Sequence, residues 1–458
     1  MWNELWNRPA VVLFLSILIG IILFRFANSF ILPIIVVAVI LLFVNENASF
    51  VILIILLSSY WASKNWNNYI QLIENIKPFE SSYIEVKGRI KEMSSKSILI
   101  DQLSIQGLSY RGVIEIIVKD SESLKYDELV DIKGNLYTNK NMELNSRQVQ
   151  KRIIGVVYPE SIEPLESPGF SLKGSAAALR ERVQERLKGY FSRDEEEVLS
   201  AMVLGIDKDV SYDTYSRFKA TGLIHTLVAS GAQVSIITSI LLPFLPKMWA
   251  VFVFPIILIY SLMAGFGVSI LRATIMMGIN ILARIIREDY DPLSSLAFSG
   301  VLILIFDPLS LFSTGFQLSF LATFALIGIS PYLRIRYLDF AIPTVTVQTL
   351  LSPLLLYKNG SIPLISFPIN ILVAPIISLI TILGFAIVIS TFTFPFITLV
   401  LSFIIKPVLY IMSAIIEWGN LKIYGVNYSP NLLELIAIYT VLGGLFYIVY
   451  TRLYRDNK

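Results

Sequence analysis

The chain has 458 residues, of which 55% are hydrophobic and 16% are charged, and its formal net charge is +3. Soluble globular proteins carry about 25% charged residues, so this composition excludes an ordinary soluble domain and indicates a protein that crosses a membrane several times. The sequence holds no cysteine, which excludes a disulfide framework, a thiolate nucleophile and an iron–sulfur site. Its single histidine excludes a histidine-rich metal centre within one chain.

The N-terminal region, residues 1–66, is predicted to hold three membrane helices. Apolar runs cover residues 9–26, 29–44 and 49–62, and the last is short for a hydrocarbon core of about 30 Å. Because the second and third runs follow the first at once, we expect a membrane anchor here rather than a cleaved signal peptide.

Residues 79–168 alternate between apolar and polar side chains, and turn residues interrupt the alternation. This periodicity predicts β-strands at 83–92, 97–105, 110–120, 129–138 and 152–159. Five short strands in one stretch predict a small closed β-barrel, for which the OB-fold is the commonest choice.

A barrel of this kind binds single-stranded nucleic acid by stacking bases on aromatic side chains over a basic groove. The tyrosines able to serve are Tyr83, Tyr110, Tyr126, Tyr137 and Tyr158. The candidate DNA contacts that we select are Tyr83, Arg89, Tyr110, Arg111 and Tyr137. The alternative is that the tyrosines pack a small β-domain, because acidic residues slightly outnumber basic ones in this stretch.

Residues 173–210 are predicted to form two linker helices. The first, at 173–191, has apolar residues spaced by three and four, so it can lie on a membrane surface or cover the β-domain. Ser192 and Glu195 form the pattern of a capping box, which predicts a second helix that begins there and ends at Gly205.

The remainder, residues 211–458, is almost continuously apolar. Its predicted spans are 221–245, 248–264, 266–286, 293–306, 312–330, 340–357, 366–390, 396–419 and 431–451. With the N-terminal helices they make about twelve crossings, which predicts a polytopic α-helical membrane protein with an inserted all-β, OB-like domain.

Clusters of basic residues in the loops predict the orientation of these spans. If each predicted span crosses the membrane once, three clusters lie on the same side, and the positive-inside rule assigns that side to the cytoplasm. The clusters are Arg284 with Arg287, Arg334 with Arg336, and Arg452 with Arg455 and Lys458. Both termini are then cytoplasmic, and the β-domain is extracytoplasmic.

The only histidine, His225, falls within the predicted span 221–245. On a helical wheel, a stripe of small and polar residues within roughly 60° is formed by Gly222, Thr226, Ser230 and Gln233. Such a stripe either lines a path through the membrane or lets neighbouring helices pack closely, and both interpretations stay open on the residues alone.

Later spans carry further polar side chains. Arg272 lies in the middle of span 266–286 with Ser269 on the same face, and a charge at that depth costs at least about 2.5 kcal/mol and needs a partner or water. Gln317 and Ser319 lie just inside the span 312–330, and Asn370 lies between two prolines. Helices interrupted by proline in this way suit a channel or a transporter.

These motifs resemble those of ComEC-type competence proteins, the inner-membrane DNA channels of natural transformation. GLIHTLVASGAQVSI (222–236), SILRATIMMG (269–278), DPLSLFSTGFQLSF (307–320) and FPINILVAPI (367–376) occur in the order of that family. The third run is the most specific. The layout of three spans, a β-domain and a competence-type membrane domain is also similar, so the resemblance covers nearly the whole chain.

The resemblance implies passage of single-stranded DNA into the cytoplasm, with other competence proteins as partners and the inner membrane as location. The residues that would line the path are His225, Thr226, Ser230, Gly231, Gln233, Ser269, Arg272, Gln317, Ser319 and Asn370. Polar and cationic groups suit a polyanion.

Two departures from the family pattern matter. The family usually has a second histidine where Gln233 stands, so we expect no metal site and no cofactor. Many members continue into a metallo-β-lactamase-like domain, but this sequence has no His-x-His-x-Asp-His cluster, so we expect no nuclease or other enzyme activity.

Two other functions remain open at this point. A secondary transporter of a small anionic solute would use Arg272 as the anion contact, and its uptake would saturate with a small molecule. A structural membrane scaffold would use the polar stripe for helix packing, so substitution of Gln233 or Arg272 would lower the protein level rather than an activity.

Overall fold

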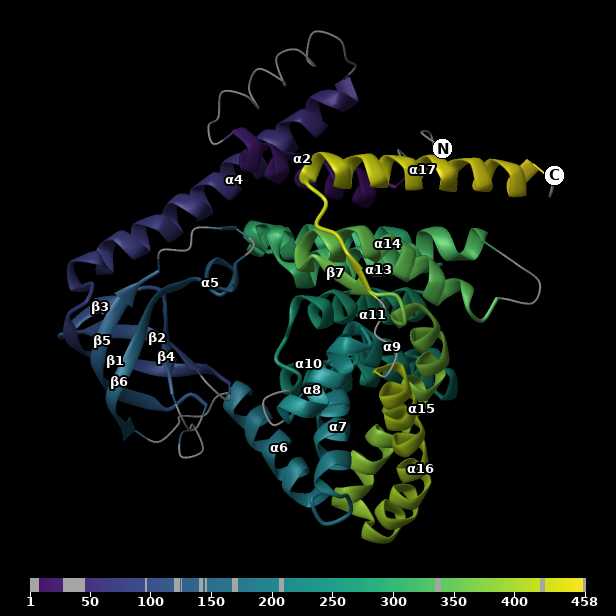
Figure 1. Cartoon of the computed structure of the whole chain (residues 1–458). Coiled ribbons are helices and arrows are strands. Elements are labelled where there is room, and N and C mark those ends of the chain that lie inside the picture. Colours follow the sequence, from purple (N-terminus) through teal and green to yellow (C-terminus); the bar gives the residue numbers. More distant parts are fainter. Residues whose placement is uncertain are drawn as a thin grey trace. The chain divides into compact units, whose positions relative to one another are not determined.

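The computed structural model describes residues 8–27, 46–94, 97–118, 124, 126–139, 143, 144, 146–166, 172–205, 210–333, 339–420 and 425–455 (Figure 1). The predicted span 29–44 and the loop residues Arg334, Arg336 and Lys458 lie outside them. The chain divides into two compact units. One combines Met1–Ala178 with Ala297–Gln317, and the other combines Leu179–Leu296 with Leu318–Lys458.

Two helices begin the first unit, α2 (Pro9–Ala27) and α4 (Glu46–Ile76). They pack closely because Gly20 of α2 has no side chain where the Ser58 hydroxyl and the Ile55 carbonyl of α4 lie. Small residues permit this kind of approach between membrane helices. The predicted span 49–62 falls inside α4, which continues beyond it through a polar stretch.

The β-domain follows α4 as a short, mostly antiparallel sheet. Its strands are β1 (Tyr83–Met93), β2 (Ser97–Ile105), β3 (Leu108–Tyr110), β4 (Val113–Ile117), β5 (Leu129–Thr138) and β6 (Ile153–Glu166). The predicted strands are confirmed with two changes. The third shortens to β4, because Gly112 before it has φ +127°, and β3 lies almost wholly outside the predicted range. The fifth extends to Glu166.

Strand pairing closes five of these strands into a ring. The order is β1-β5-β6-β4-β2, and β1 also pairs with β2, while β3 extends from β2. All pairs are antiparallel except β4 with β6. Alternate residues of β1, including Ile84, Val86 and Ile90, are almost fully buried, which is the inward face that the sequence alternation predicts.

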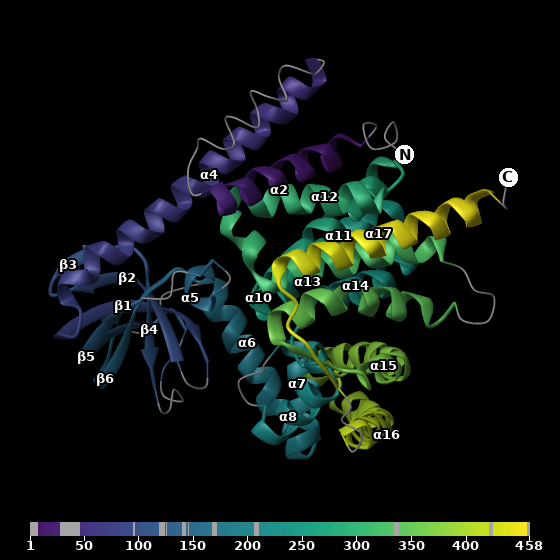
Figure 2. The same ribbon diagram turned by 45° about the horizontal axis from the view of Figure 1, so that its top comes forward.

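The second unit is helical. Its elements are most of α6 (Leu172–Leu187), α7 (Arg193–Leu204), α8 (Tyr212–Ala220), α9 (Gly231–Leu241), α10 (Val253–Met263), α11 (Val268–Ile286), the start of α12 (Pro292–Phe306), most of α13 (Thr314–Phe324), α14 (Ile342–Asn359), α15 (Ser366–Thr393), α16 (Pro395–Asn420) and α17 (Leu432–Arg455). The predicted capping box of Ser192 and Glu195 starts α7, and Gly205 ends it with φ +72°. In both views α14 and α17 lie side by side, and Tyr439 donates to the Leu350 carbonyl at 2.9 Å (Figures 1 and 2).

Four helical stretches among the described residues are long and apolar enough to cross a membrane. They are Val268–Ile286, Thr314–Tyr332, Ser366–Thr393 and Pro395–Asn420. The count of about twelve crossings stays a prediction.

The predicted helix at 221–245 is wrong. Gly222 has φ +75°, a left-handed conformation that ends α8, and the chain then forms a short 3-10 turn at Ile224–Thr226. Ser230 is extended and starts α9 at the next residue. Because the chain is not helical between these points, the stripe expected on one helix face does not form.

Two arginines of α6 bind the ends of other helices in the second unit. Arg180 donates to the Met263 carbonyl at the end of α10 at 3.2 Å, and Arg186 donates to the Thr391 carbonyl near the end of α15 at 2.7 Å. The two arginines are about 9 Å apart along one helix, so α6 connects the ends of α10 and α15. The orientation of the predicted spans stays a prediction.

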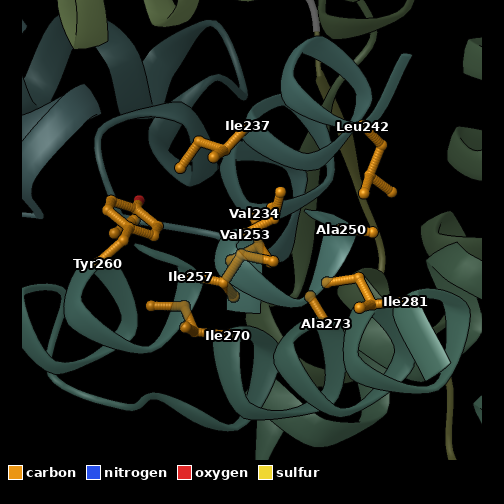
Figure 3. Packing of buried hydrophobic residues seen from close by; sticks show 11 residues of the cluster. Val234, Ile237, Leu242, Ala250, Val253, Ile257, Tyr260, Ile270, Ala273 and Ile281 are labelled. Atoms are coloured by element: carbon orange, nitrogen blue, oxygen red, sulfur yellow. The ribbon is translucent and has the colours of Figure 1, made fainter. Parts of the chain in front are cut away.

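A buried apolar cluster holds α9, α10 and α11 together (Figure 3). Val234 and Ile237 of α9 belong to it with Val253 and Ile257 of α10 and Ala273 of α11. In a membrane protein such side chains stabilise the packing through van der Waals contacts between the helices. The cluster therefore fixes the first turn of α9, with Gly231 and Gln233, against α11, with Ser269 and Arg272.

Candidate functional site

Gln233 closes the N-terminal end of α9. Its Oε1 accepts from the backbone N–H and from the hydroxyl of Ser230, both at 2.7 Å. Its Nε2 donates to the Met202 carbonyl of α7 at 3.0 Å. Only 3% of Gln233 is exposed, so both ends of the amide are occupied by structural hydrogen bonds.

Arg272 lies beside this helix end. It is 8% exposed, and Nη1 donates to the Ser319 carbonyl at 3.1 Å, while Nε has no partner. No carboxylate in the described part of the chain lies within ion-pair distance of it. Arg272 is therefore a buried cation without a counter-charge, beside the positive end of a helix.

Gly231 makes this close contact possible. A Cβ atom at Gly231 would lie 2.7 Å from Nη2 of Arg272, 2.9 Å from the Ala273 Cβ and 2.9 Å from the Ser269 carbonyl oxygen. Only glycine leaves room for α11 at this point. Ser269 therefore contributes its backbone, and not its hydroxyl, to the contact.

His225 lies in the turn before α9 rather than on a membrane helix. Its side chain is exposed, and Nδ1 lies 3.2 Å from the Gly222 carbonyl oxygen. Thr226 is buried and donates to the Leu223 carbonyl at 2.8 Å. Gly222 in turn contacts α15, since a Cβ there would lie 2.7 Å from the Ser366 Cβ.

Asn370 is connected to the turn at Gly222 by Ser366, which contacts both residues. The Ser366 carbonyl accepts from Asn370 Nδ2 at 2.8 Å and from Gln348 Nε2 at 3.0 Å. The Oε1 of Gln348 is buried without a partner. The sequence prediction missed Gln348, although an amide within the apolar segment 340–357 was a visible signal.

The two remaining predicted residues, Gln317 and Ser319, belong to different compact units. Ser319 supplies the carbonyl that holds Arg272. Gln317 belongs to the first unit, where its Nε2 donates to the Leu311 carbonyl at 3.0 Å. The structure thus brings together Ser230, Gly231, Gln233, Ser269, Arg272 and Ser319.

The β-domain carries a patch of three exposed tyrosines, Tyr83, Tyr137 and Tyr158, which we call the tyrosine patch. Their exposed fractions are 53%, 44% and 54%. Asn135 of β5 is paired with Tyr83 of β1 and with Tyr158 of β6, so these side chains share one outer face with Tyr137. The rings of Tyr137 and Tyr158 meet edge to face with centroids 5.6 Å apart.

The other candidate contacts of the β-domain lie elsewhere. Tyr110 packs against Phe79, with ring centroids 5.9 Å apart. Arg89 donates to the Asp127 carbonyl at 2.7 Å, and Arg111 is exposed. The tyrosine patch therefore keeps Tyr83 and Tyr137 from the predicted set and adds Tyr158.

The DPLSLF segment contacts the β-domain within the first unit. Arg152 lies 3.5 Å from Asp307 Oδ1 and donates to Asn65 Oδ1 at 3.2 Å. Gln150 donates to the Leu309 carbonyl at 3.3 Å. Burial raises the pKa of Asp307, and the Arg152 guanidinium counteracts part of that rise. The turn predicted at Asp307 occurs, but the sequence did not indicate its partner.

The apolar helices and the small β-domain define a helical membrane protein with a minor β-domain. The Competence protein family matches residues 202–452, so the chain belongs to that family, and the resemblance to ComEC-type proteins is confirmed at this level. Family and apolar helices together indicate an inner-membrane protein.

Three curated relatives illustrate the similarity. ComE operon protein 3 of Bacillus subtilis is 24% identical over 214 residues, which are 45% of this chain and 28% of that protein. Uncharacterized protein MG316 of Mycoplasma genitalium is 28% identical over 260 residues, 55% of this chain and 66% of that protein. An uncharacterized protein of Aquifex aeolicus is 26% identical over 292 residues, 62% of this chain and 64% of that protein. The chain thus spans less than two thirds of each relative, and no solved structure matches it.

Proposed function

We propose that this protein is a channel that passes single-stranded DNA across the inner membrane during competence, and that it acts as a channel rather than as an enzyme. Membership of the Competence family supports a role in DNA uptake. The other partners in this proposal are competence proteins and the lipid bilayer.

The tyrosine patch is the observation that carries the proposal. Exposed tyrosine rings on adjacent strands offer faces on which bases can stack, and stacking of a base on such a ring contributes about 1–3 kcal/mol. We assign the five-stranded ring with its single parallel pair to an OB-fold, a fold that binds oligonucleotides. In this proposal the β-domain lies outside the cytoplasm and receives the strand.

The test measures binding of a fluorescent single-stranded oligonucleotide to the full chain in detergent. Alanine at all three positions of the tyrosine patch is expected to weaken binding by about tenfold or more, since each stacked base contributes at least 1 kcal/mol. Tyr212→Ala is the matched control, because Tyr212 is 86% exposed but lies on α8. Equal affinity of the triple variant and the control would refute this role of the patch.

A small-anion transporter remains the second candidate, and Arg272 is the observation that favours it. An unpaired buried guanidinium suits any anion that enters the second unit. Uptake of a small anion that saturates, is lost in Arg272→Gln and is unaffected by DNA would favour that function over the channel.

A further inference from the structure

Two positive groups meet at Gly231. The first turn of α9 carries the positive end of the helix dipole, roughly half an elementary charge. Arg272 places its guanidinium against the same turn, as the 2.7 Å between Nη2 and the ideal Cβ position of Gly231 shows. A cation normally stabilises the opposite end of a helix, so this arrangement is unfavourable unless an anion joins it.

Arg272 has donors to spare for such an anion. Within the described ranges Arg272 makes one hydrogen bond, to the Ser319 carbonyl, whereas a guanidinium has five N–H groups. Nε is buried without a partner. The planar arrangement of the remaining donors matches the two oxygens of a phosphate or carboxylate.

Burial strengthens the argument. Arg272 is only 8% exposed, and an unpaired charge at such a position is costly. Ala232, in the same first turn of α9, is exposed, so the helix end lies at the surface of the second unit. Gly231 has no side chain that would shield the turn from the guanidinium.

We propose that Arg272 and the first turn of α9 form a phosphate-binding site. This inference rests on the proposed function, because in a channel for single-stranded DNA the group that binds is a phosphate of the DNA backbone. Successive phosphates occupy the site one at a time and exchange as the strand advances. The capping box of Ser230 and Gln233 holds the helix end in place for this purpose.

The experiment compares the melting temperature of the full chain in detergent with sodium phosphate and with sodium chloride at equal ionic strength. Phosphate is expected to raise the melting temperature of the wild type, because a ligand that binds the folded state stabilises it. The shift is expected to vanish in Arg272→Gln. Should that variant fail to fold, Arg272→Lys is used, since lysine keeps the charge but loses the planar pair of donors and should bind phosphate about tenfold more weakly.

Arg284→Gln is the matched control. Arg284 lies on the same helix, donates to the Leu245 carbonyl at 3.0 Å and also has a buried, unpartnered Nε, but it lies at the end of α11 away from Gly231. The phosphate shift should persist in this variant. Absence of a shift in the wild type, a shift that survives in Arg272→Gln, or a phosphate affinity of Arg272→Lys equal to that of the wild type would overturn the site.

An oligothymidylate added as competitor separates this inference from the proposed function. Displacement of phosphate by the oligonucleotide supports both. Binding of phosphate through Arg272 without competition from DNA supports the site and contradicts the DNA channel. DNA uptake that depends on the protein while phosphate does not bind overturns the site alone.

Discussion

Substitution of Gln233 tests whether this amide is a helix cap or a channel lining. Gln233→Ala removes the acceptor of the Ser230 N–H and the donor to the buried Met202 carbonyl. Loss of a capping interaction costs about 0.5–2 kcal/mol, and an unsatisfied buried carbonyl costs about 1–3 kcal/mol. Together they predict a loss of about 1.5–5 kcal/mol in the free energy of unfolding.

Gln233→Glu separates the two contributions. Glutamate keeps an acceptor for the Ser230 N–H and places a negative charge at the helix N-terminus, but it cannot donate to Met202. Its stability should fall between those of the wild type and Gln233→Ala. The assay is the melting temperature of the full chain in detergent, followed by tryptophan fluorescence, together with the amount of protein in the membrane.

The opposite pattern would refute this reasoning. If Gln233→Ala melts like the wild type and reaches the same level in the membrane while DNA uptake is lost, the amide acts on the transported strand and not on the fold. The role of Gln233 as a cap would then be wrong.

Three further changes test the geometry. Gly231→Ala should cost about 1–3 kcal/mol by forcing α9 from α11, whereas Gly444→Ala, with open space around it, should not lower the melting temperature. Asp307→Ala and Arg152→Ala should show a coupling of at most about 1 kcal/mol in a double-mutant cycle of unfolding, because the Arg152 and Asp307 side chains are 42% and 37% exposed, and a larger value would contradict this. Burial raises the pKa of Tyr69 to about 12, above that of the unfolded chain, so the contribution of Tyr69 to stability should be complete below pH 10 and decline as the pH rises towards 12. Denaturant unfolding should show a smaller decline over this range in Tyr69→Phe than in the wild type, and an equal decline would contradict this.

The strands were predictable because their signal is local. The predicted ranges 97–105 and 129–138 agree with β2 and β5 at both ends, since alternation and turn residues fix a strand that buries one face. The helix cap at Ser192 was predictable for the same reason. Even Gly112, which shortens the third predicted strand, was visible as a breaker.

The start of α9 had a local signal that the prediction did not use. Ser230 and Gln233 have the spacing of a capping box, and this pattern predicts a helix that begins at residue 231. The apolar run around it instead predicts a single span with His225 on it, and the structure has a turn there. Hydropathy measures burial in lipid, but it does not distinguish one long helix from a turn between two short ones.

Other features depend on distant parts of the chain. Arg152 and Asp307 are 155 residues apart, and no spacing rule connects them. The arginines of α6 bind carbonyls at the ends of α10 and α15, more than 80 residues further along the chain, and no local pattern indicates these partners. The position of Arg272 beside α9 likewise follows from packing between helices.

The central claim is best tested by following labelled DNA into the cytoplasm of the source cell with and without this protein. The DNA channel predicts that, without the protein, DNA accumulates outside and none reaches the cytoplasm. It also predicts that the wild-type chain restores uptake, whereas a stable Arg272 variant does not. Undiminished arrival of DNA in cells that lack the protein would contradict the channel and make the small-anion transporter the leading function.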